Sequence, residues 1–189
     1  ILRENMTQPK DIVLTRAVIQ IKSVKSKTFD DHIAYIRIAS FHERTSDDLR
    51  KALADVSAKT TPMQGLVLDL RNDPGGLLNQ AIEVSDMFLK SGMIVSTRGR
   101  AKNMETKTMA RDNGGKEFTV PMVVLVNEGT ASAAEIVAGA LQDNGRALIV
   151  GTQTFGKASV QTVIPLENGS ALKLTTARYY TPNGRSIQA

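Results

Sequence analysis

The sequence predicts an α/β fold with a mostly parallel core sheet. Two apolar runs of strand length, Gly65–Leu70 and Met122–Val126, each end in a turn that is followed by a helical pattern. Strands with apolar centres that alternate with helices are typical of a parallel sheet. After Lys157 the pattern becomes strand-like, so we expect flanking strands there. The 189 residues, of which 41% are apolar, suffice for one domain with a sizeable core.

The first half of the chain contributes three predicted strands and two predicted helices. Asp11–Val24 is rich in β-branched residues and predicts one long strand or two short ones, and His32–Ile38 predicts another. A helix begins at about Thr45, because hydroxyls and carboxylates fill its first turn. The strand Gly65–Leu70 turns into a second helix, which we expect to run to about Lys90.

The second half begins with two predicted strands, Met93–Arg100 and Phe118–Val126, on either side of a polar stretch. That stretch, Ala101–Lys116, contains Asn-Gly-Gly and predicts a hairpin-like surface loop. The third helix begins at about Ala133, and the apolar run Ala147–Val150 returns the chain through the sheet. The last two predicted strands are Val160–Leu166 and Ala171–Tyr180.

Composition excludes several classes of protein. The net charge is +5, but the basic residues are scattered and only 4% of residues are aromatic, which argues against a nucleic-acid groove. The absence of cysteine excludes disulfides, thiolate zinc sites and a cysteine nucleophile. No apolar run approaches the roughly 18 residues of a transmembrane helix. The sequence indicates no cofactor and no metal site.

The residues that carry chemistry lie between Pro121 and Gln161. Ser132 falls where a turn meets a helix, so its hydroxyl lies beside unpaired backbone N–H groups and the positive end of the helix dipole. Lys157 follows the return strand, so its amine and the serine hydroxyl could meet. The alternative is structural: Ser132 and Glu135 also fit a capping box, and Lys157 could be a solvated loop charge.

Other arrangements of a serine hydrolase fit the sequence less well. No G-x-S-x-G string is present. The one S-x-x-K string, Ser170–Lys173, lies in a strand-like segment, where positions three apart point to opposite faces. A Ser-His-Asp triad would need His32 or His42, and neither has a supporting motif. A serine-lysine dyad is the arrangement left.

A nucleotide-binding phosphate loop is an alternative from another class of protein. Gly151–Ala158 fits G-x-x-x-x-G-K-[ST] at every position but the last. Ala158 has no hydroxyl for magnesium, and the residues that follow predict a strand where a phosphate loop opens a helix.

Two stretches carry a family resemblance. VVLVNEGTASAAEIVAGALQDNGRALIVGTQTFGKASVQ resembles the core signature of the carboxy-terminal processing peptidases, the tail-specific serine proteases of bacterial envelopes and plastid lumens. GLVLDLRNDPGGLLNQAIEVSDMFL resembles their other signature, and the likeness extends from about Tyr35 to Gln188. This chain departs from the common pattern at Thr130, which keeps a hydroxyl where the family commonly has serine, and at Ala158, which adds a methyl group where the family commonly has glycine.

The resemblance implies a ClpP/crotonase-like fold of β-β-α units and a catalytic site without metal or cofactor. Ser132 would be the nucleophile, Lys157 the general base and Gln161 the residue that orients the lysine. Lysine titrates near 10.4 in water, so the base must be desolvated, and the apolar neighbours in FGKASV favour its burial. The oxyanion hole would be formed by two amides, that of Ala133 and that of either Gly75 or Gly76.

The resemblance also implies an organisation, a substrate class and a location. Residues 1–10 would be the remnant that follows an absent PDZ domain, and residues 11–189 the protease core. The substrates would be unstructured or carboxy-terminal regions of proteins, cleaved in the bacterial periplasm or cell envelope after export by a signal absent from this sequence. A catalytically silent peptide-binding core is the alternative. The oligomeric state is open, with a homo-oligomer among the options.

Overall fold

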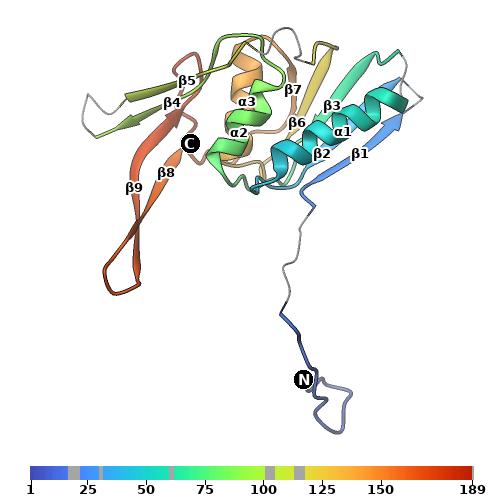
Figure 1. Cartoon of the computed structure of the whole chain (residues 1–189), viewed down its shortest axis with the longest axis vertical. Helices are drawn as coiled ribbons and strands as arrows, with labels where there is room; N and C mark the ends of the chain where they lie inside the picture. The colour runs from blue at the N-terminus through green and yellow to red at the C-terminus, as the bar shows by residue number, and fades with distance from the viewer. Residues whose placement is uncertain (17–21, 30–31, 60–61, 101–104, 113–117, 189) are drawn as a thin grey trace.

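The structure, a computed structural model, describes residues 1–16, 22–29, 32–59, 62–100, 105–112 and 118–188. It confirms the predicted α/β class, with a mostly parallel five-stranded sheet in the order β1-β2-β3-β6-β7 (Figure 1). β1 runs antiparallel to β2, and the other neighbours in this sheet are parallel. The strands of this sheet are β1 (Val24–Phe29), β2 (Ile33–Ile38), β3 (Gly65–Asp69), β6 (Met122–Val126) and β7 (Leu148–Gly151).

Three helices in the described residues pack beside this sheet. They are α1 (Thr45–Lys59), α2 (Leu78–Asp86) and α3 (Ala133–Asp143). α1 lies across β1 and β2, and α2 packs against both α1 and α3 (Figure 1). Every residue of α3 from Ala133 to Leu141 is buried, so this helix lies in the core rather than on its surface.

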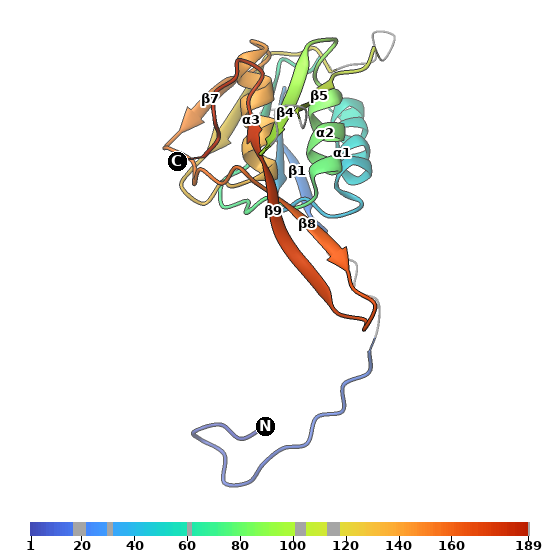
Figure 2. The same cartoon turned by 90° about the vertical axis from the view of Figure 1, so that its left-hand side faces the viewer.

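The second sheet is antiparallel and has the order β5-β4-β9-β8. Its strands are β4 (Met93–Gly99), β5 (Glu105–Met109), β8 (Ser159–Pro165) and β9 (Ala171–Tyr180). The hairpin formed by β8 and β9 extends well away from the body of the molecule (Figure 2). Most of its side chains are exposed, which confirms flanking strands after Lys157.

The predicted strand Asp11–Val24 is wrong over its first part. Residues 11–16 are exposed and form no strand, residues 17–21 lie outside the described residues, and β1 begins only at Val24. The β-branched residues suit a pleated backbone, but a strand forms only where a partner supplies the ladder of hydrogen bonds. That ladder starts at the pair Val24 and Ile38.

Two further boundaries differ from the prediction. α2 ends at Asp86 rather than near Lys90, although Phe88 and Leu89 beyond it are buried. Those two apolar residues continue the helical periodicity, but they fill the core from the connection that follows the helix. β6 begins at Met122 rather than Phe118, and the proline before Met122 has no N–H to donate to a ladder.

The polar stretch Ala101–Lys116 contains a strand that the sequence did not predict. β5 pairs with β4 through polar residues, and Thr97 lies opposite Thr106 with their hydroxyls 2.5 Å apart. The stretch therefore belongs to a hairpin, as expected, but part of it is sheet. Its Asn-Gly-Gly turn, Asn113–Gly115, lies outside the described residues.

The loops that follow β2, β3 and β6 meet at the carboxyl ends of these strands. The Phe41 N–H donates to Gly75 O, and the Leu77 N–H donates to Phe41 O, each at 2.9 Å. The Ala131 N–H donates to Asp73 O at 2.8 Å. In parallel α/β sheets, ligands bind beyond the carboxyl ends of the strands. The three loops therefore mark the place for a functional site.

Candidate active site

Ser132 has a strained backbone. It is the N-cap of α3, with φ of 54° and ψ of −113°, a region that residues other than glycine rarely adopt. Such a conformation costs about 1–3 kcal/mol and is found mostly at functional sites. Hydrogen bonds hold it: the Ser132 N–H donates to Glu135 Oε2 at 2.7 Å, and Ser132 O accepts from the Ile136 N–H at 3.0 Å.

The serine lies at the amino end of a buried helix. Ala133, directly after it, is 1% exposed, and the rest of α3 up to Leu141 is buried as well. The positive end of the helix dipole is therefore poorly screened by water at this point. Negative charge that develops beside Ser132 would be stabilised there.

Gly75 brings the loop after β3 into contact with the serine turn. Its φ is +90°, and a Cβ atom at this position would lie 2.6 Å from Ala131 O and 2.7 Å from Ala133 N. No other residue fits there without displacing the turn. The Gly75 N–H donates to Asp73 Oδ1 at 2.8 Å, whereas Gly76 is exposed. The loop thus lies beside the Ala133 amide, as an oxyanion hole would require.

Asp73 is a buried acid that the sequence analysis did not single out. Its side chain has no exposed surface, and Oδ2 has no hydrogen-bond partner among the described residues. Burial raises the pKa of Asp73 to about 7, against the opposing effects of the Gly75 N–H and the charge of Arg37. An acidic residue directly before Pro-Gly-Gly was the only sequence signal for it.

Lys157 lies in the segment Thr152–Ala158, which connects β7 to β8. The Phe155 N–H donates to Thr130 O at 2.9 Å, and the Lys157 N–H donates to Glu135 Oε2 at 2.9 Å. Because the Ser132 N–H bonds to the same oxygen of Glu135, the main chains of the serine and the lysine lie side by side.

The side chains of the predicted dyad are not joined in this structure. Lys157 is exposed and its neighbour Phe155 is 63% exposed, so the burial expected from FGKASV is absent. Among the described residues, no hydrogen bond links the Ser132 hydroxyl or Gln161 to the Lys157 amine. Gln161 is an exposed residue of β8, opposite Thr175. Catalytic hydrogen bonds often form only when substrate binds.

The other candidate hydroxyl and the histidines have structural roles. Thr130 is fully buried, and its hydroxyl donates to Leu70 O at 2.8 Å, so it is not available as a nucleophile. His42 is exposed, with Nε2 2.7 Å from Ser40 Oγ. His32 is exposed as well, with Nδ1 3.3 Å from Pro62 O.

The phosphate-loop alternative is wrong. The segment after Gly151–Ala158 is the strand β8 rather than a helix, so no helix amino terminus faces the loop. The S-x-x-K pair Ser170 and Lys173 lies in the exposed β8–β9 hairpin, away from the loops that meet at Ser132.

Charged residues at the ends of β3 and α3 form ion pairs and hydrogen bonds that stabilise the neighbouring loops. Arg71 and Asp69 form an ion pair at 2.8 Å at the end of β3. Burial tends to raise the pKa of Asp69, but hydrogen bonds from Arg71 and Tyr35 outweigh it and bring this pKa to about 2. Asp143, at the end of α3, binds Arg185 at 2.7 Å and the Asn183 N–H at 2.9 Å. These carboxylates support the fold, and among the described residues neither forms a hydrogen bond with Ser132.

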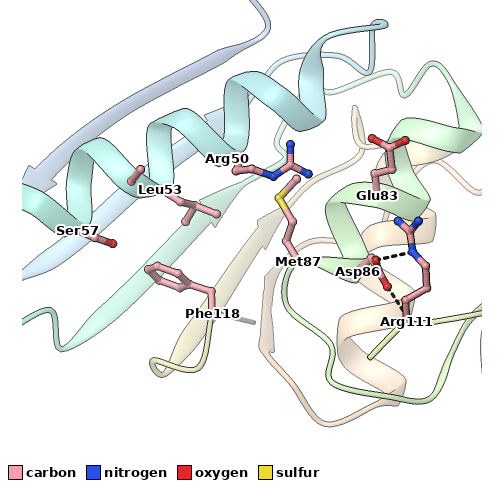
Figure 3. A pocket seen from close by; sticks show the side chains of 9 residues that line it. Arg50, Leu53, Ser57, Glu83, Asp86, Met87, Arg111 and Phe118 are labelled. Atoms are coloured by element: carbon pink, nitrogen blue, oxygen red, sulfur yellow. Dashed lines mark hydrogen bonds and ion pairs between the residues drawn. The ribbon is translucent and has the colours of Figure 1, made fainter. Parts of the chain in front are cut away.

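A cavity of about 770 Å³ lies between α1 and α2, and none of the predicted catalytic residues line it (Figure 3). The ion pair of Asp86 and Arg111, at 3.0 Å, lies at its wall. Its lining consists of Arg50, Leu53, Ala54, Ser57, Glu83, Asp86, Met87, Arg111 and Phe118. A smaller cavity of about 360 Å³ includes Glu135 and Thr154 in its lining, and so lies next to the site.

In the part of the chain that the structure describes, no cluster of three or more histidine or acidic residues could hold a metal ion. No helix in the same residues combines the length and apolar character needed to cross a membrane.

Comparisons with known proteins identify a family model and relatives that match this chain. The model of a family described as Peptidase family S41 matches residues 32–189. The carboxy-terminal-processing protease of Bartonella bacilliformis is 52% identical over 188 residues, which cover 98% of this chain and 43% of the relative. The carboxy-terminal processing protease CtpA of Bacillus subtilis is 40% identical over 177 residues, covering 94% of this chain and 37% of the relative.

Among solved structures, the photosystem II D1 C-terminal processing protease is similar, with a TM-score of 0.79 and 35% identity. The match covers 92% of this chain and 47% of that chain. The chain thus spans less than half the length of these relatives. The fold, the loops around Ser132 and these similarities agree, and the chain belongs to peptidase family S41.

Proposed function

We propose that this chain is the core of a serine endopeptidase with a Ser132–Lys157 catalytic dyad. The strained backbone of Ser132 is the main support for this proposal, because it lies at the amino end of a buried helix with the Lys157 main chain beside it. Membership of the S41 family and relatives named carboxy-terminal processing proteases agree with it.

In the proposed reaction, uncharged Lys157 takes the proton of the Ser132 hydroxyl, and the alkoxide attacks a peptide carbonyl. The Ala133 amide and an amide of Gly75 or Gly76 stabilise the oxyanion. Gly76 is the simpler choice, because the Gly75 N–H already donates to Asp73. The peptide C–N bond then breaks as the leaving amine takes the proton from Lys157, which leaves an acyl-enzyme. The uncharged Lys157 next activates a water that hydrolyses the acyl-enzyme and frees Ser132, while Gln161 orients the lysine amine.

Substrate binding supplies the desolvation that the lysine needs. Lys157 and Phe155 are exposed in the free chain, so a peptide that lies over both would remove water from the amine. β8 begins two residues after Lys157 and is the last strand in the order of its sheet. An extended peptide would add to this edge as a further strand, which accounts for a preference for unstructured or carboxy-terminal regions.

The dyad is tested by single substitutions. Ser132→Ala and Lys157→Ala should each lower the turnover of an unstructured protein by roughly 10⁴-fold or more while the fold is retained. Ser170→Ala and Lys173→Ala are matched controls, because they alter a serine and a lysine of the exposed hairpin, and should cleave like the wild type. Activity of the wild type should rise from mildly acidic to mildly alkaline pH. Unchanged turnover in either dyad variant rejects the assignment.

A catalytically silent peptide-binding core is the second candidate. It is favoured by the exposed lysine and by the lack of a hydrogen bond between the dyad side chains in the described residues. In that case the wild type would show no turnover, and Ser132→Ala would bind an unstructured peptide with wild-type affinity.

The proposed place of action is the bacterial periplasm or cell envelope. Bacterial relatives named carboxy-terminal processing proteases and the resemblance to envelope proteases support it. Fractionation of the bacterium that encodes the chain tests this placement, and recovery in the cytoplasmic fraction alone would contradict it.

A further inference from the structure

The carboxylate of Glu135 lies between the two halves of the proposed dyad. Glu135 is 4% exposed and belongs to the first turn of α3. Its Oε2 accepts from the Ser132 N–H at 2.7 Å and from the Lys157 N–H at 2.9 Å. Its Oε1 accepts from the Thr154 hydroxyl and from the Gly156 N–H, both at 2.7 Å. One side chain thus binds both catalytic segments.

Helix capping does not account for this arrangement. In a capping box, the Glu135 carboxylate has only to accept from the N–H of the N-cap residue, Ser132, and the second bond of the box joins the Ser132 side chain to the Glu135 N–H. Three of the four donors belong instead to Thr154, Gly156 and Lys157, which follow β7 and lie outside the helix. The segment that carries Lys157 forms no strand at this point. It is held against the serine turn by the bond from the Phe155 N–H to Thr130 O and by the hydrogen bonds to Glu135.

The negative charge of Glu135 suits this role. In the described part of the chain it forms no salt bridge, and its two oxygens are satisfied by three backbone N–H groups and one hydroxyl. Hydrogen bonds to an ionised acceptor are about twice as strong as neutral ones. The amino end of α3 adds further stabilisation of the charge. The carboxylate therefore holds the Ser132 turn and the Lys157 segment by hydrogen bonds. In the described residues it does so without an ion pair that would bring a second cation beside Lys157.

We infer that Glu135 is a positioning residue that sets the Lys157 segment against Ser132, so that amine and hydroxyl meet when substrate binds. This inference rests on the proposed function. It assigns to Glu135 no contact with substrate and no proton transfer.

Glu135→Gln tests the inference, because it keeps the shape of the side chain but replaces one oxygen by an NH₂ group. At least one backbone N–H then faces a donor and loses its acceptor. We expect kcat to fall on the order of 10²-fold, with KM nearly unchanged because the β8 edge is untouched. Thr154→Val removes one donor only and should cause a smaller fall in the same direction.

Glu128→Gln is the matched control. Glu128 is exposed, and its Oε2 accepts from the Thr152 hydroxyl of the same connecting segment at 3.1 Å. It makes no hydrogen bond to Ser132 or Lys157 among the residues described. Its replacement should leave kcat at the wild-type level, so a loss in Glu135→Gln cannot be ascribed to any weakened carboxylate contact with the segment.

Two measurements separate positioning from other roles of Glu135. First, the fraction of folded, reactive enzyme is titrated with a fluorophosphonate that labels Ser132, and kcat is expressed per labelled site. Second, kcat is followed to its alkaline plateau, where the lysine is uncharged in wild type and variant alike. Positioning predicts a loss per labelled site that persists on the plateau. An electrostatic role predicts that the acidic side of the pH profile of kcat shifts while the plateau value stays the same. A role in folding alone predicts that a smaller fraction of the enzyme is labelled, with a normal kcat per labelled site.

Either of these last two outcomes overturns the inference, as does wild-type kcat in both Glu135→Gln and Thr154→Val. Should Glu135→Gln fail to fold, Thr154→Val decides alone. Failure of the proposed function is recognised separately, since either Ser132→Ala and Lys157→Ala would then cleave like the wild type, or the wild type itself would show no turnover.

Discussion

At the scale of single residues, the site combines a strained serine with a buried acid. The left-handed backbone of Ser132 persists because Gly75 and Glu135 hold the turn from both sides. Asp73 lies below the same loops and has one carboxylate oxygen without a partner in the described residues. Burial opposes its ionisation, so it lowers the stability of the fold once it is charged.

Asp73→Asn should therefore stabilise the protein at alkaline pH. The folded-state pKa of Asp73, about 7, lies above the value of 3.8 expected for the unfolded chain. The contribution of Asp73 to the free energy of unfolding is therefore most favourable below about pH 4, and it is lost as the pH rises through 7. Between pH 5 and pH 8, the wild type should lose on the order of 3 kcal/mol of unfolding free energy through this group. Asparagine keeps an acceptor for the Gly75 N–H without ionising.

Urea unfolding of wild type and Asp73→Asn at pH 5 and pH 8 measures this effect. The variant should gain stability relative to the wild type at the higher pH. Titration of Asp69 and of other groups common to both proteins cancels in the difference. Equal differences at the two pH values would contradict the burial of an ionisable Asp73.

At the scale of elements, α3 organises the site because both of its ends are fixed. Its amino end carries Ser132 and Glu135, and Asp143 near its carboxyl end binds Arg185. Arg146, just beyond the helix, donates to the carbonyl oxygens of Phe88, Phe118 and Val120. Arg146 thereby joins α3 to the connection that follows α2 and to the segment before β6.

Arg146→Ala should destabilise the fold by at least about 2 kcal/mol, because three carbonyl groups lose their donor. Arg146→Lys should recover only part of this, since one ammonium cannot reproduce the planar set of guanidinium donors. Arg50→Ala is the control: in the described residues Arg50 pairs with Asp47 alone, and both side chains are exposed, so the change should alter stability by less than about 0.5 kcal/mol. Urea unfolding measures the stability of all three variants. Equal losses in Arg146→Ala and Arg50→Ala would contradict a stabilising role for the hydrogen bonds of Arg146.

At the scale of the whole molecule, the buried core and the projecting hairpin differ in how they are stabilised. The core surrounds α3, β3 and β6, whereas the far part of the β8–β9 hairpin has exposed apolar side chains such as Ile164 and Leu172. The hairpin is held by its own ladder and, near its base, by the pairing of β9 with β4.

Hydrogen exchange should separate these two parts. We expect the amides of α3, β3 and β6 to exchange only on global unfolding, and those near the hairpin tip to exchange much faster through local opening. Mass spectrometry of exchanged peptides measures both. Protection of the hairpin tip equal to that of α3 would contradict the exposed hairpin and would indicate that another surface covers it in solution.

Local patterns were sufficient for most of the core. The apolar runs of β3 and β6 and the first turn of α1 follow from periodicity and capping chemistry, which depend on neighbouring residues alone. The end of α2 and the strand β5 did not follow. Phe88 and Leu89 continue a helical pattern although they pack from a connection, and the polar residues of β5 form a strand only because β4 lies beside them.

The sequence by itself determined the α/β class, the family resemblance and the choice of Ser132 and Lys157, because turn chemistry and family signatures are written in contiguous residues. Only the tertiary structure decided that Ser132 is strained, that Asp73 is buried, and that Glu135 binds both segments that carry the proposed dyad. It also showed Lys157 exposed where its apolar neighbours predicted burial. These properties depend on contacts between residues far apart in the chain, and the burial of a side chain depends on the segments that pack against it rather than on its sequence neighbours.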